Sequence, residues 1–523
     1  MKKVILSVFC CLQVFSNAQQ VEWAKAVAAD ICAAHYDQAS DKVYFTGIAD
    51  YGSVTIDGLK HYFNTSSRSY ITEITKGGLV NNVAYIKGDF IPLDFTKEPD
   101  FYFCGFPTGG NSFCLARNKP NADTSWDHCY GSIPPAGHHS TYYPNNMAYS
   151  VVLHKNYLYA IGVYQDSLNM DGQWLYGSNA LLAKFNPITG QHIWVKNIPG
   201  NDWYSRMKIV NFANENFLIG SDIYYGGSYH YDSIQIQIPR KATILSKADT
   251  NGKFKWARVV AEGTILRGMS TDYKNNIYIA GEFSDSCKMG GTTYQGPYGG
   301  LFVMKTDSVG TELWHKIFYN RQYTSVGNIG CLATDTLGSV YVTGSLENDS
   351  LDLLDTVLTR YGPAVSGFLI KYNTSGTFKY AYTLPDTTAS FGYWVTADNE
   401  GAVYWSGRFY NQASIGNFVL NGNNPNQSPT NYLIKIKSEV ANDVKTISQE
   451  AYVSLYPNPS SGKFTLVSSQ RISSVYVRNV FGEVVLQTAF PSSSIDMNTF
   501  PKGMYFVETV CGNKRHVQKV LLD

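Results

Sequence analysis

A tetrapeptide of the form Tyr-x-x-Gly, with Phe in one copy, recurs seven times and constrains the fold more than any other feature of the chain. Successive glycines are 58, 57, 58, 61, 63 and 63 residues apart. Aromatic and β-branched residues that follow an Asp/Gly turn are typical of a strand, which the glycine ends, bends or opens to a neighbouring backbone. The copies are Tyr44–Gly47, Tyr102–Gly105, Tyr159–Gly162, Phe217–Gly220, Tyr278–Gly281, Tyr341–Gly344 and Tyr404–Gly407.

A second element follows later in most units: an apolar triplet, a basic residue, an Asp/Asn-x-x-Gly type of turn and an aromatic residue such as Trp194, Trp256 or Trp314. Two short strands around such a turn predict a tight antiparallel hairpin. The basic residues could form a ring that lines a pore. However, each one occurs together with the turn, which favours a structural role in which it caps the turn or pairs with the turn aspartate. They are Arg117, Lys184, Lys247, Lys305, Lys371 and Lys435, and Glu73 stands in the first copy.

Seven units of about 60 residues without a helical pattern predict a β-propeller. One four-stranded unit cannot bury both faces, whereas units packed around an axis can. A solenoid would need capping repeats, and none is visible in the sequence. The chain begins with a Trp strand (Trp23–Val27) that lacks its hairpin partner, and the last unit ends with a partner (Tyr432–Ile436) that lacks its Trp strand. We therefore expect an all-β chain with a seven-bladed propeller over residues 19–437, closed by these two strands.

The units also resemble bacterial propeller repeats built around Asp-x-x-Gly-Asn-x-Tyr-Val-x-Gly and apolar-Lys-x-Asp-x-x-Gly-x-x-x-Trp. The resemblance covers about residues 20–437. It implies a fold and no particular activity.

The N-terminus has the pattern of an export signal. Two lysines precede the twelve-residue apolar run Val4–Phe15, and small residues (Ser16 and Ala18) lie at positions −3 and −1 of a predicted cleavage site. The run is shorter than the ~20 residues that span a bilayer, which argues against a membrane anchor. We expect residues 1–18 to be a cleaved signal peptide, and we expect no transmembrane segment.

Export permits disulfides, but the cysteines do not form a disulfide scaffold. Nine are present, two of them in the predicted signal peptide, and there is no Cys-x-x-Cys for a structural zinc site. Only Cys104 and Cys114 are near enough to bridge across a local turn, and two separate buried thiols are the alternative. We expect neither a metal nor a cofactor.

The repeat pattern ends near the C-terminus, and a different pattern of strands and turns follows. Residues 438–452 are polar and aperiodic, which predicts a linker. Residues 453–523 alternate short strands with turns and predict a small antiparallel β-sandwich. Its motifs are Tyr-Pro-Asn-Pro-x-x-Gly, Asn-x-x-Gly-x-x-Val and Gly-x-Tyr-x-Val, represented by Tyr456, Pro457, Asn458, Pro459, Gly462, Gly482, Gly503 and Tyr505.

These three motifs, in this order at the end of the chain, resemble the type A sorting domain of the type IX secretion system of Bacteroidetes. The resemblance implies that the N-terminal signal directs passage through the inner membrane. The sorting domain would then direct passage across the outer membrane, with the secretion machinery as its partner. In that family the domain is usually removed, and the cargo is released or attached to surface lipopolysaccharide. We therefore expect a secreted or surface-displayed protein.

The sequence contains few candidate catalytic or metal-binding motifs. HExxH, GxSxG, a Walker loop and a GxGxxG in a strand–helix context do not occur. A net charge of +1 gives no basic surface for nucleic acid. His138-His139 fits an exposed Gly/Pro-rich loop better than a metal site. The Asp turns lack the ligand spacing of a calcium loop.

The long connections after the Tyr-x-x-Gly strands, and one loop after a Trp strand, carry aromatic residues. Aromatic faces beside glycines suit platforms for sugars or peptides. The alternative is that these rings pack between blades or under their own loops, since tyrosine is abundant, with 39 residues. The candidate ligand-binding residues are Trp174, Tyr176, Trp203, Tyr204, Tyr225, Tyr229, Tyr294 and Tyr298.

These observations favour a non-catalytic binding or adhesion protein for a glycan or a protein ligand. The alternative is a secreted polysaccharide hydrolase or lyase with its active site at the axial mouth of the propeller, where loops converge. Such an enzyme needs converging carboxylates, or a base and a nucleophile. A structural or adhesive coat component is a third hypothesis.

Overall fold

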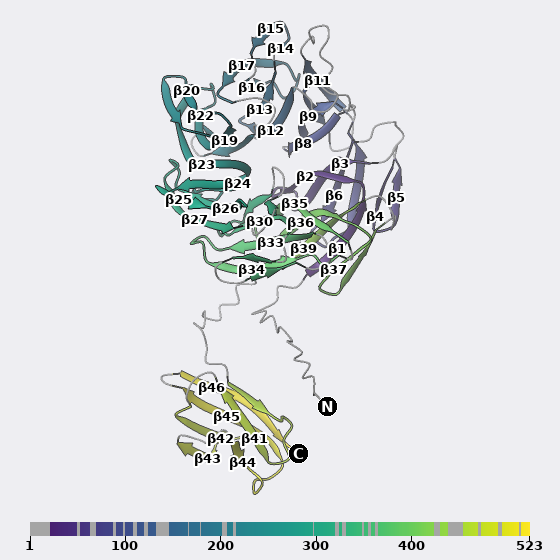
Figure 1. The fold of residues 1–523 in the computed structure, drawn as a ribbon. Coiled ribbons are helices and arrows are strands. Elements are labelled where there is room, and N and C mark those ends of the chain that lie inside the picture. Colours follow the sequence, from purple (N-terminus) through teal and green to yellow (C-terminus); the bar gives the residue numbers. More distant parts are fainter. Residues whose placement is uncertain are drawn as a thin grey trace, which may run out of the picture. The chain divides into compact units, whose positions relative to one another are not determined.

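The computed structural model describes two parts of the chain, which form two compact units, Met1–Glu439 and Val440–Asp523 (Figure 1). The predicted signal peptide and linker lie outside the described residues. In the described part all regular secondary structure is β-strand, and no helix there is long and apolar enough to cross a membrane. Described are residues 21–437 and 453–523 except 50–52, 63–68, 87–89, 98–99, 108–111, 120–123, 132–145, 166, 178, 201–206, 213–215, 297, 320–323, 327–330, 348–349, 354–356, 361–364, 387, 423–428, 469–471, 490–493 and 512–513.

The strands of the first unit pair, within the described residues, into seven successive four-stranded antiparallel sheets, here called blades 1 to 7 in chain order. The long strand β23 ends blade 4 and begins blade 5. The first strands are β2 (Asp30–Asp37), β8 (Phe90–Lys97), β12 (Met147–His154), β18 (Met207–Phe212), β23 (Phe254–Thr271), the short β28 (Thr324–Val326) and β29 (Leu332–Thr334) together, and β35 (Ser390–Ala397). The second strands are β3 (Lys42–Ile48), β9 (Phe101–Pro107), β13 (Tyr157–Tyr164), β19 (Asn216–Ile223), β24 (Ile277–Met289), β30 (Val340–Leu346) and β36 (Val403–Phe409).

The outer half of each blade repeats the same order. The third strands are β6 (Ser69–Thr75), β10 (Ser112–Asn118), β16 (Asn179–Phe185), β22 (Ala242–Asp249), β26 (Gly300–Thr306), β33 (Ser366–Tyr372) and β39 (Thr430–Ile436). The fourth strands are β7 (Val80–Tyr85), β11 (Thr124–Gly131), β17 (His192–Ile198), β23, β27 (Glu312–Tyr319), β34 (Phe378–Thr383) and, for blade 7, β1 (Val21–Ala28).

The blades form a closed ring, which is the β-propeller that the repeats predict (Figure 1). Each first strand contacts the first strand of the next blade, and β35 of blade 7 contacts β2 of blade 1. The predicted closure is confirmed, because β1 pairs antiparallel with β39, with Trp23 opposite Lys435 and Val27 opposite Asn431. Blade 7 therefore takes strands from both ends of the repeat region.

Short hairpins are inserted between the second and third strands of six blades. Because neighbouring strands are antiparallel, these insertions lie on one face of the ring, here called the hairpin face. The turns between first and second and between third and fourth strands lie on the opposite, turn face. The hairpins are β4 (Ser53–Ile56) with β5 (Leu59–Tyr62), β14 (Ser167–Met170) with β15 (Gln173–Tyr176), β20 (Gly227–Tyr231) with β21 (Ile234–Ile238), the end of β24 with β25 (Thr292–Gln295), β31 (Ser350–Asp352) with β32 (Val357–Thr359), and β37 (Gln412–Ile415) with β38 (Phe418–Asn421).

The aromatic residues of the seven Tyr-x-x-Gly copies occupy equivalent buried positions on the second strands, as predicted. None exposes more than 3% of its surface. The hydroxyl groups of Tyr159, Tyr278 and Tyr341 reach the next blade. Tyr278 donates to the Gly338 carbonyl (2.9 Å), and the Tyr341 hydroxyl lies 3.2 Å from the Gly401 carbonyl. The repeated tyrosine therefore joins blades as well as filling the core.

The glycine of the same motif allows a close approach of the first strand. A Cβ atom on Gly281 would lie 2.2 Å from the carbonyl oxygen of Ile265, and one on Gly407 would lie 1.8 Å from that of Phe391. In both blades the first strand has a β-bulge directly after this carbonyl, which brings its backbone toward the glycine. Of the roles considered for the glycine, a close backbone approach is the one observed.

The fourth-strand tryptophans pack across blade boundaries onto a turn glycine of the next blade. A Cβ on Gly252 would lie 2.8 Å from the Trp194 ring, and one on Gly376 would lie 2.9 Å from Trp314. These glycines also have a positive φ, near +77°, that other residues adopt only with strain. The pairs are Trp23–Gly78, Trp126–Gly190, Trp194–Gly252, Trp256–Gly310 and Trp314–Gly376.

One disulfide prediction is wrong. The bridge joins Cys114 to Cys129, which face each other on the paired strands β10 and β11, and Cys104 is a free, buried thiol. Cys104 pairs in register with Leu115, one residue away from Cys114. Since successive side chains of a strand point to opposite faces, Cys104 and Cys114 point away from each other.

The second unit is a sandwich of two antiparallel sheets. Its core contains Phe464, Val477, Tyr505 and Val520. One sheet has the order β40-β41-β44 and the other β43-β42-β45-β46. The strands are β40 (Val453–Tyr456), β41 (Lys463–Ser468), β42 (Ser474–Arg478), β43 (Val484–Ala489), β44 (Ser494–Asp496), β45 (Gly503–Cys511) and β46 (Lys514–Leu522).

The close approach at the repeat glycine predicts a large effect of a single methyl group. We expect Gly281→Ala to lower the free energy of unfolding by about 3 kcal/mol, because the bulged strand must move to accommodate the Cβ. Gly77→Ala is the control, since its Cβ would meet nothing closer than 3.9 Å. Chemical denaturation of the mature protein measures both, and equal effects of the two substitutions would contradict the explanation.

The ring closure predicts that Trp23 stabilises the whole propeller. Trp23 is 7% exposed, packs on Gly78 and donates its indole N–H to the Lys76 carbonyl (2.9 Å). Trp23→Ala should cost about 3–5 kcal/mol through the cavity that it leaves. Trp174→Ala, at a ring 37% exposed, should change the unfolding free energy little. Similar losses in both variants would show that closure does not depend on the Trp23 contact.

Candidate functional site

The predicted aromatic residues of blade 3 form a stacked pair on the hairpin face. Trp174 and Tyr176 lie two residues apart on β15, so their side chains leave the strand on the same side. Their ring centroids are 6.0 Å apart and their planes differ by 15°. Tyr176 is 69% exposed. The pair offers an apolar, aromatic surface to solvent.

The predicted pair of blade 4 is held by a hydrogen bond. The hydroxyl of Tyr229, on β20, donates to the backbone carbonyl of Tyr225 at 2.8 Å. Tyr225 precedes the hairpin and is 62% exposed. This bond fixes the plane of the Tyr229 ring relative to the hairpin.

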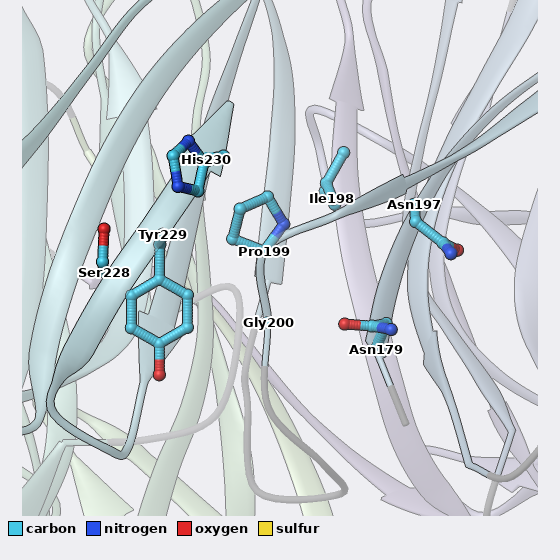
Figure 2. Close-up of a pocket in the computed structure, with 8 residues that line it drawn as sticks. All are labelled: Asn179, Asn197, Ile198, Pro199, Gly200, Ser228, Tyr229 and His230. Carbon is cyan, nitrogen blue, oxygen red and sulfur yellow. The ribbon is translucent and has the colours of Figure 1, made fainter. Parts of the chain in front are cut away.

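A pocket of about 250 Å³ lies between blades 3 and 4 (Figure 2). Figure 2 shows Tyr229 and His230 of β20 on one side and Asn179 and Asn197 of blade 3 on the other. The chain passes between them at Pro199 and Gly200. The remaining lining residues are Ile198 and Ser228.

The geometry of the pocket follows from local contacts. A Cβ on Gly200 would lie 2.4 Å from that of Ala180, so only glycine lets the chain pass this close to β16. The hydroxyl of Tyr164 lies 2.8 Å from Oδ1 of Asn197, and the Asn197 amide therefore directs its Nδ2 donor elsewhere. Ser228 accepts a hydrogen bond from the Gln235 side chain.

The lining is suited to binding a polar, uncharged ligand. Two side-chain amides and one serine supply donors and acceptors, and Tyr229 supplies a ring face. Asp and Glu do not occur among the lining residues. A carboxylate pair for acid–base chemistry is therefore not provided by this pocket.

Other predicted residues are not part of the pocket lining. Tyr294 packs into blade 5, where its hydroxyl lies 2.7 Å from Nε2 of His315. Tyr294 is partly buried against the core of its own blade. Tyr298 is 57% exposed. Trp203 and Tyr204, and the His138-His139 pair, lie outside the described residues.

Charged residues near the axis mainly join blades. Oδ2 of Asp94 on β8 accepts hydrogen bonds from the Ser150 hydroxyl on β12 (2.6 Å) and the Lys208 ammonium on β18 (2.7 Å). One carboxylate thus ties the first strands of blades 2, 3 and 4 together. This cluster is explained by the fold without a ligand.

Acidic groups of blades 5 and 6 offer the best support for the enzyme alternative. Glu282 accepts a hydrogen bond from Nε of Arg267 at 2.9 Å. Burial, and then the charge of Glu282, raise the pKa of Glu347 above its usual value. A carboxyl group with a raised pKa beside another acid is a feature of glycosidases. Neither Glu282 nor Glu347 lines the pocket between blades 3 and 4.

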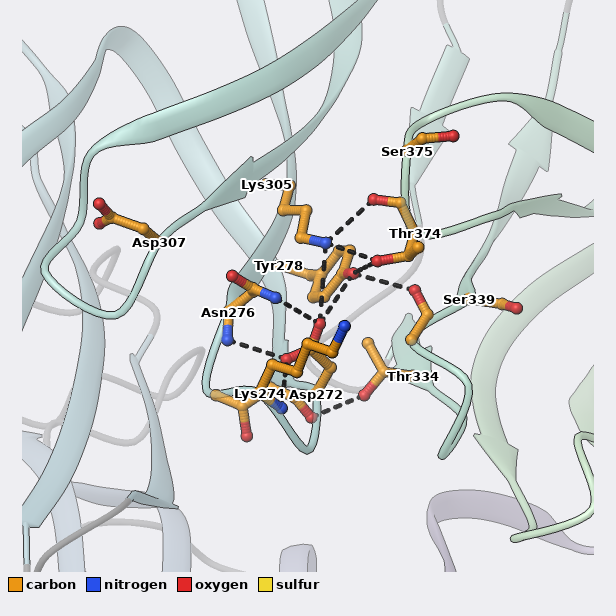
Figure 3. A network of polar contacts seen from close by, with 12 residues as sticks. Asp272, Lys274, Asn276, Tyr278, Lys305, Asp307, Thr334, Ser339, Thr374 and Ser375 are labelled. Atoms are coloured by element: carbon orange, nitrogen blue, oxygen red, sulfur yellow. Dashed lines mark hydrogen bonds and ion pairs between the residues drawn. The ribbon is translucent and has the colours of Figure 1, made fainter.

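The repeated lysines are structural, but their partner differs from the prediction (Figure 3). The ammonium group of Lys305 donates to the carbonyl (2.9 Å) and the hydroxyl (2.6 Å) of Thr374, in the turn of the next blade. It lies 3.7 Å from Asp272, while Asp307 of its own hairpin accepts backbone N–H groups of that turn. Burial lowers the pKa of Lys305, and Asp272 opposes this shift.

The same arrangement recurs at the ring closure, where Lys435 donates to the carbonyl of Lys76 at 2.9 Å. Lys305, Lys371 and Lys435 are at most 5% exposed. They lie on third strands, away from the first strands that contact one another around the axis. These residues therefore do not form a basic ring that lines a pore.

The residues of the sorting motifs hold turns and strand ends of the second unit. The Asn458 side chain donates to a carbonyl of β46 (2.7 Å) and accepts an N–H of the same strand (2.9 Å). Gly462 and Gly482 have φ values of +123° and +84°. The Tyr505 hydroxyl donates to the Pro501 carbonyl at 2.7 Å. These motifs specify the fold of the unit.

Comparison with protein families identifies this second unit. Residues 454–523 match the family described as the secretion system C-terminal sorting domain. The chain therefore carries a type IX sorting domain, which directs it to the cell surface or the extracellular space. A comparison with curated proteins finds no match.

Among solved structures the chain is similar to several propellers at low identity. They include the Dos1 propeller (7% identity, 79% of this chain and 93% of that chain, TM-score 0.41). They also include an ulvan lyase (8% identity, 74% of this chain and 93% of that chain, TM-score 0.40). PorZ of Porphyromonas gingivalis, described as a surface component of the type IX secretion system, is a further example (12% identity, 92% of this chain and 74% of that chain, TM-score 0.24). At such TM-scores these similarities carry no functional argument, and the fold assignment rests on the strand pairings.

The sorting domain predicts where a truncated protein accumulates. We expect deletion of residues 453–523 to leave a folded propeller in the periplasm, because every described strand of the ring lies before residue 437. Cell fractionation with an antibody against the propeller measures this. Recovery of the truncated protein from the medium in wild-type amounts would refute the sorting role.

Proposed function

We propose that the protein is a secreted binding protein that holds a glycan in the pocket between blades 3 and 4. The observation that carries this proposal is the position of Tyr164. Its hydroxyl lies 2.8 Å from Oδ1 of Asn197 in the pocket and 3.2 Å from the backbone carbonyl of Tyr176. The buried Tyr164 hydroxyl thus links the hairpin that carries the stacked Trp174–Tyr176 pair to an amide of the pocket.

The combination of groups suits a carbohydrate. Sugar hydroxyl groups both donate and accept, as do the amides of Asn179 and Asn197. The apolar face of a sugar ring packs against aromatic rings such as Tyr229 and Trp174, which lose little conformational entropy on binding. The pocket is at the small end of ligand sites. It therefore suits one sugar unit, with the exposed ring pair available to the next.

Binding without turnover is favoured over hydrolysis by the lining residues. General acid–base catalysis needs titratable groups within hydrogen-bond reach of the substrate. His230 is the ionisable lining residue other than tyrosine, and it stands without a carboxylate partner in the lining. The hydrolase or lyase hypothesis would instead depend on Glu282 and Glu347 of blades 5 and 6.

Substitutions in the pocket test the proposal. Asn197→Ala and Tyr229→Ala should each weaken binding of the best ligand on a glycan array about tenfold, the equivalent of about 1.4 kcal/mol. Tyr298→Ala removes an exposed tyrosine outside the pocket and should bind like the wild type. Calorimetry with the selected glycan and the mature protein would quantify the three variants.

Two results would contradict the proposal. One is unchanged binding by both pocket variants. The other is release of product from the bound glycan that Glu347→Gln or Glu282→Gln abolishes, because this would establish the hydrolase alternative.

A further inference from the structure

The outer face of one sheet of the sorting domain is unusually apolar. In a sandwich the side chains that point away from the core are normally polar. Seven of the 23 large hydrophobic residues that are exposed in the described part of the chain belong to this small domain. They are Val480, Phe481, Val484, Met504, Phe506, Val517 and Leu521.

The strand register gathers most of these residues on one surface. Met504 lies opposite Leu521, and Phe506 lies opposite Arg478 in β42, which in turn lies opposite Val484. Residues paired across antiparallel strands point to the same side of the sheet. The neighbouring positions Tyr505, Val507 and Val520 point to the other side and form the core. We call the outward surface of β43-β42-β45-β46 the outer face.

The outer face carries excess positive charge. Phe506 is opposite Lys519, and Glu508 is opposite Val517. Arg478 (3.2 Å) and Arg515 (2.5 Å) both form ion pairs with Glu508. Two arginines thus share one carboxylate, and Lys519 adds a further cation at the register position opposite Phe506.

Some residues of the motifs are engaged in holding the fold of the domain. The Asn458 amide is bonded to β46 on both sides, and Tyr505 is 6% exposed with its hydroxyl bonded to a backbone carbonyl. The motif glycines have no side chain to be read. Pro457, Asn458 and Pro459 of the first motif are exposed. The outer face is a further exposed surface, and it offers both apolar area and charge.

We infer that the outer face is the surface by which the sorting domain docks on the secretion machinery, and that the docking site there is an apolar protein surface rimmed by carboxylates. Exposed apolar patches of this kind mark interaction sites. The uncompensated cations favour an acidic partner and orient the complex. This inference concerns residues 474–522 and is independent of glycan binding by the propeller.

Secretion of full-length variants from the native host tests the inference. Phe506→Ser and Val517→Ser should each lower the amount of protein in the medium at least tenfold and leave precursor in the periplasm. The matched control is Lys463→Ser, an exposed position on the other sheet, which should be secreted like the wild type. All purified variants should keep the wild-type unfolding midpoint and glycan binding, which separates a docking defect from misfolding.

Charge reversal tests the chemistry of the partner. Lys519→Glu should reduce secretion well below the level of Lys519→Met, because only reversal places like charges against the acidic rim. A photo-crosslinking residue at position 517 should link the full chain to a component of the outer-membrane secretion machinery. Wild-type secretion of the Phe506, Val517 and Lys519 variants, or crosslinks confined to lipid or to a second copy of this chain, would overturn the inference.

Discussion

The contact between a tryptophan and the turn glycine of the next blade is the interaction on which the ring depends. The turn needs a glycine because its φ is positive, and the same missing Cβ provides the space that the indole fills, as at Trp194 and Gly252. The lysine of the third strand adds a hydrogen bond to that turn, as Lys305 does to Thr374. Each unit therefore carries one half of a joint that is completed only by its neighbour. This explains why the motifs recur at nearly constant spacing and why an isolated unit would leave buried groups without partners.

The contacts of this joint lie on the turn face of the ring. The hairpin face carries insertions that differ from blade to blade. The turns that receive tryptophan, lysine and tyrosine lie on the turn face, so changes in their length would break contacts between blades. The hairpins between second and third strands also make contacts between blades, as β4 does with β1, but they differ from blade to blade in length and residues. The hairpins, the Trp174–Tyr176 pair and the pocket between blades 3 and 4 all belong to the hairpin face. A rigid ring with variable loops on one side is a common way to build a binding surface.

Features that depend on local pattern or on repetition could be predicted from the sequence. The propeller, the buried tyrosines and the pairing of Trp23 with the strand of Lys435 follow from spacing and from the incomplete units at the two ends. The disulfide could not be predicted, because a shift of one residue in register decides whether Cys104 or Cys129 faces Cys114. The pocket could not be predicted either, since Asn197 and Tyr229 belong to different blades and meet only after blade packing. Tyr294 and Tyr229 occur in similar Gly-rich segments and are both partly buried, yet the Tyr294 hydroxyl is bonded to His315 whereas Tyr229 lines the pocket.

The position of the closing strands makes the strand pairing of the ring independent of the sorting domain. β39 is the last described strand before the sorting domain, and it is hydrogen-bonded on both sides, to β36 and to β1. Loss of everything after residue 437 would therefore break no strand pairing in the ring. The sorting domain has a separate core, built around Phe464 and Val477. Each unit therefore has its own core and its own strand pairings, so the strand pairing of the ring does not depend on the sorting domain.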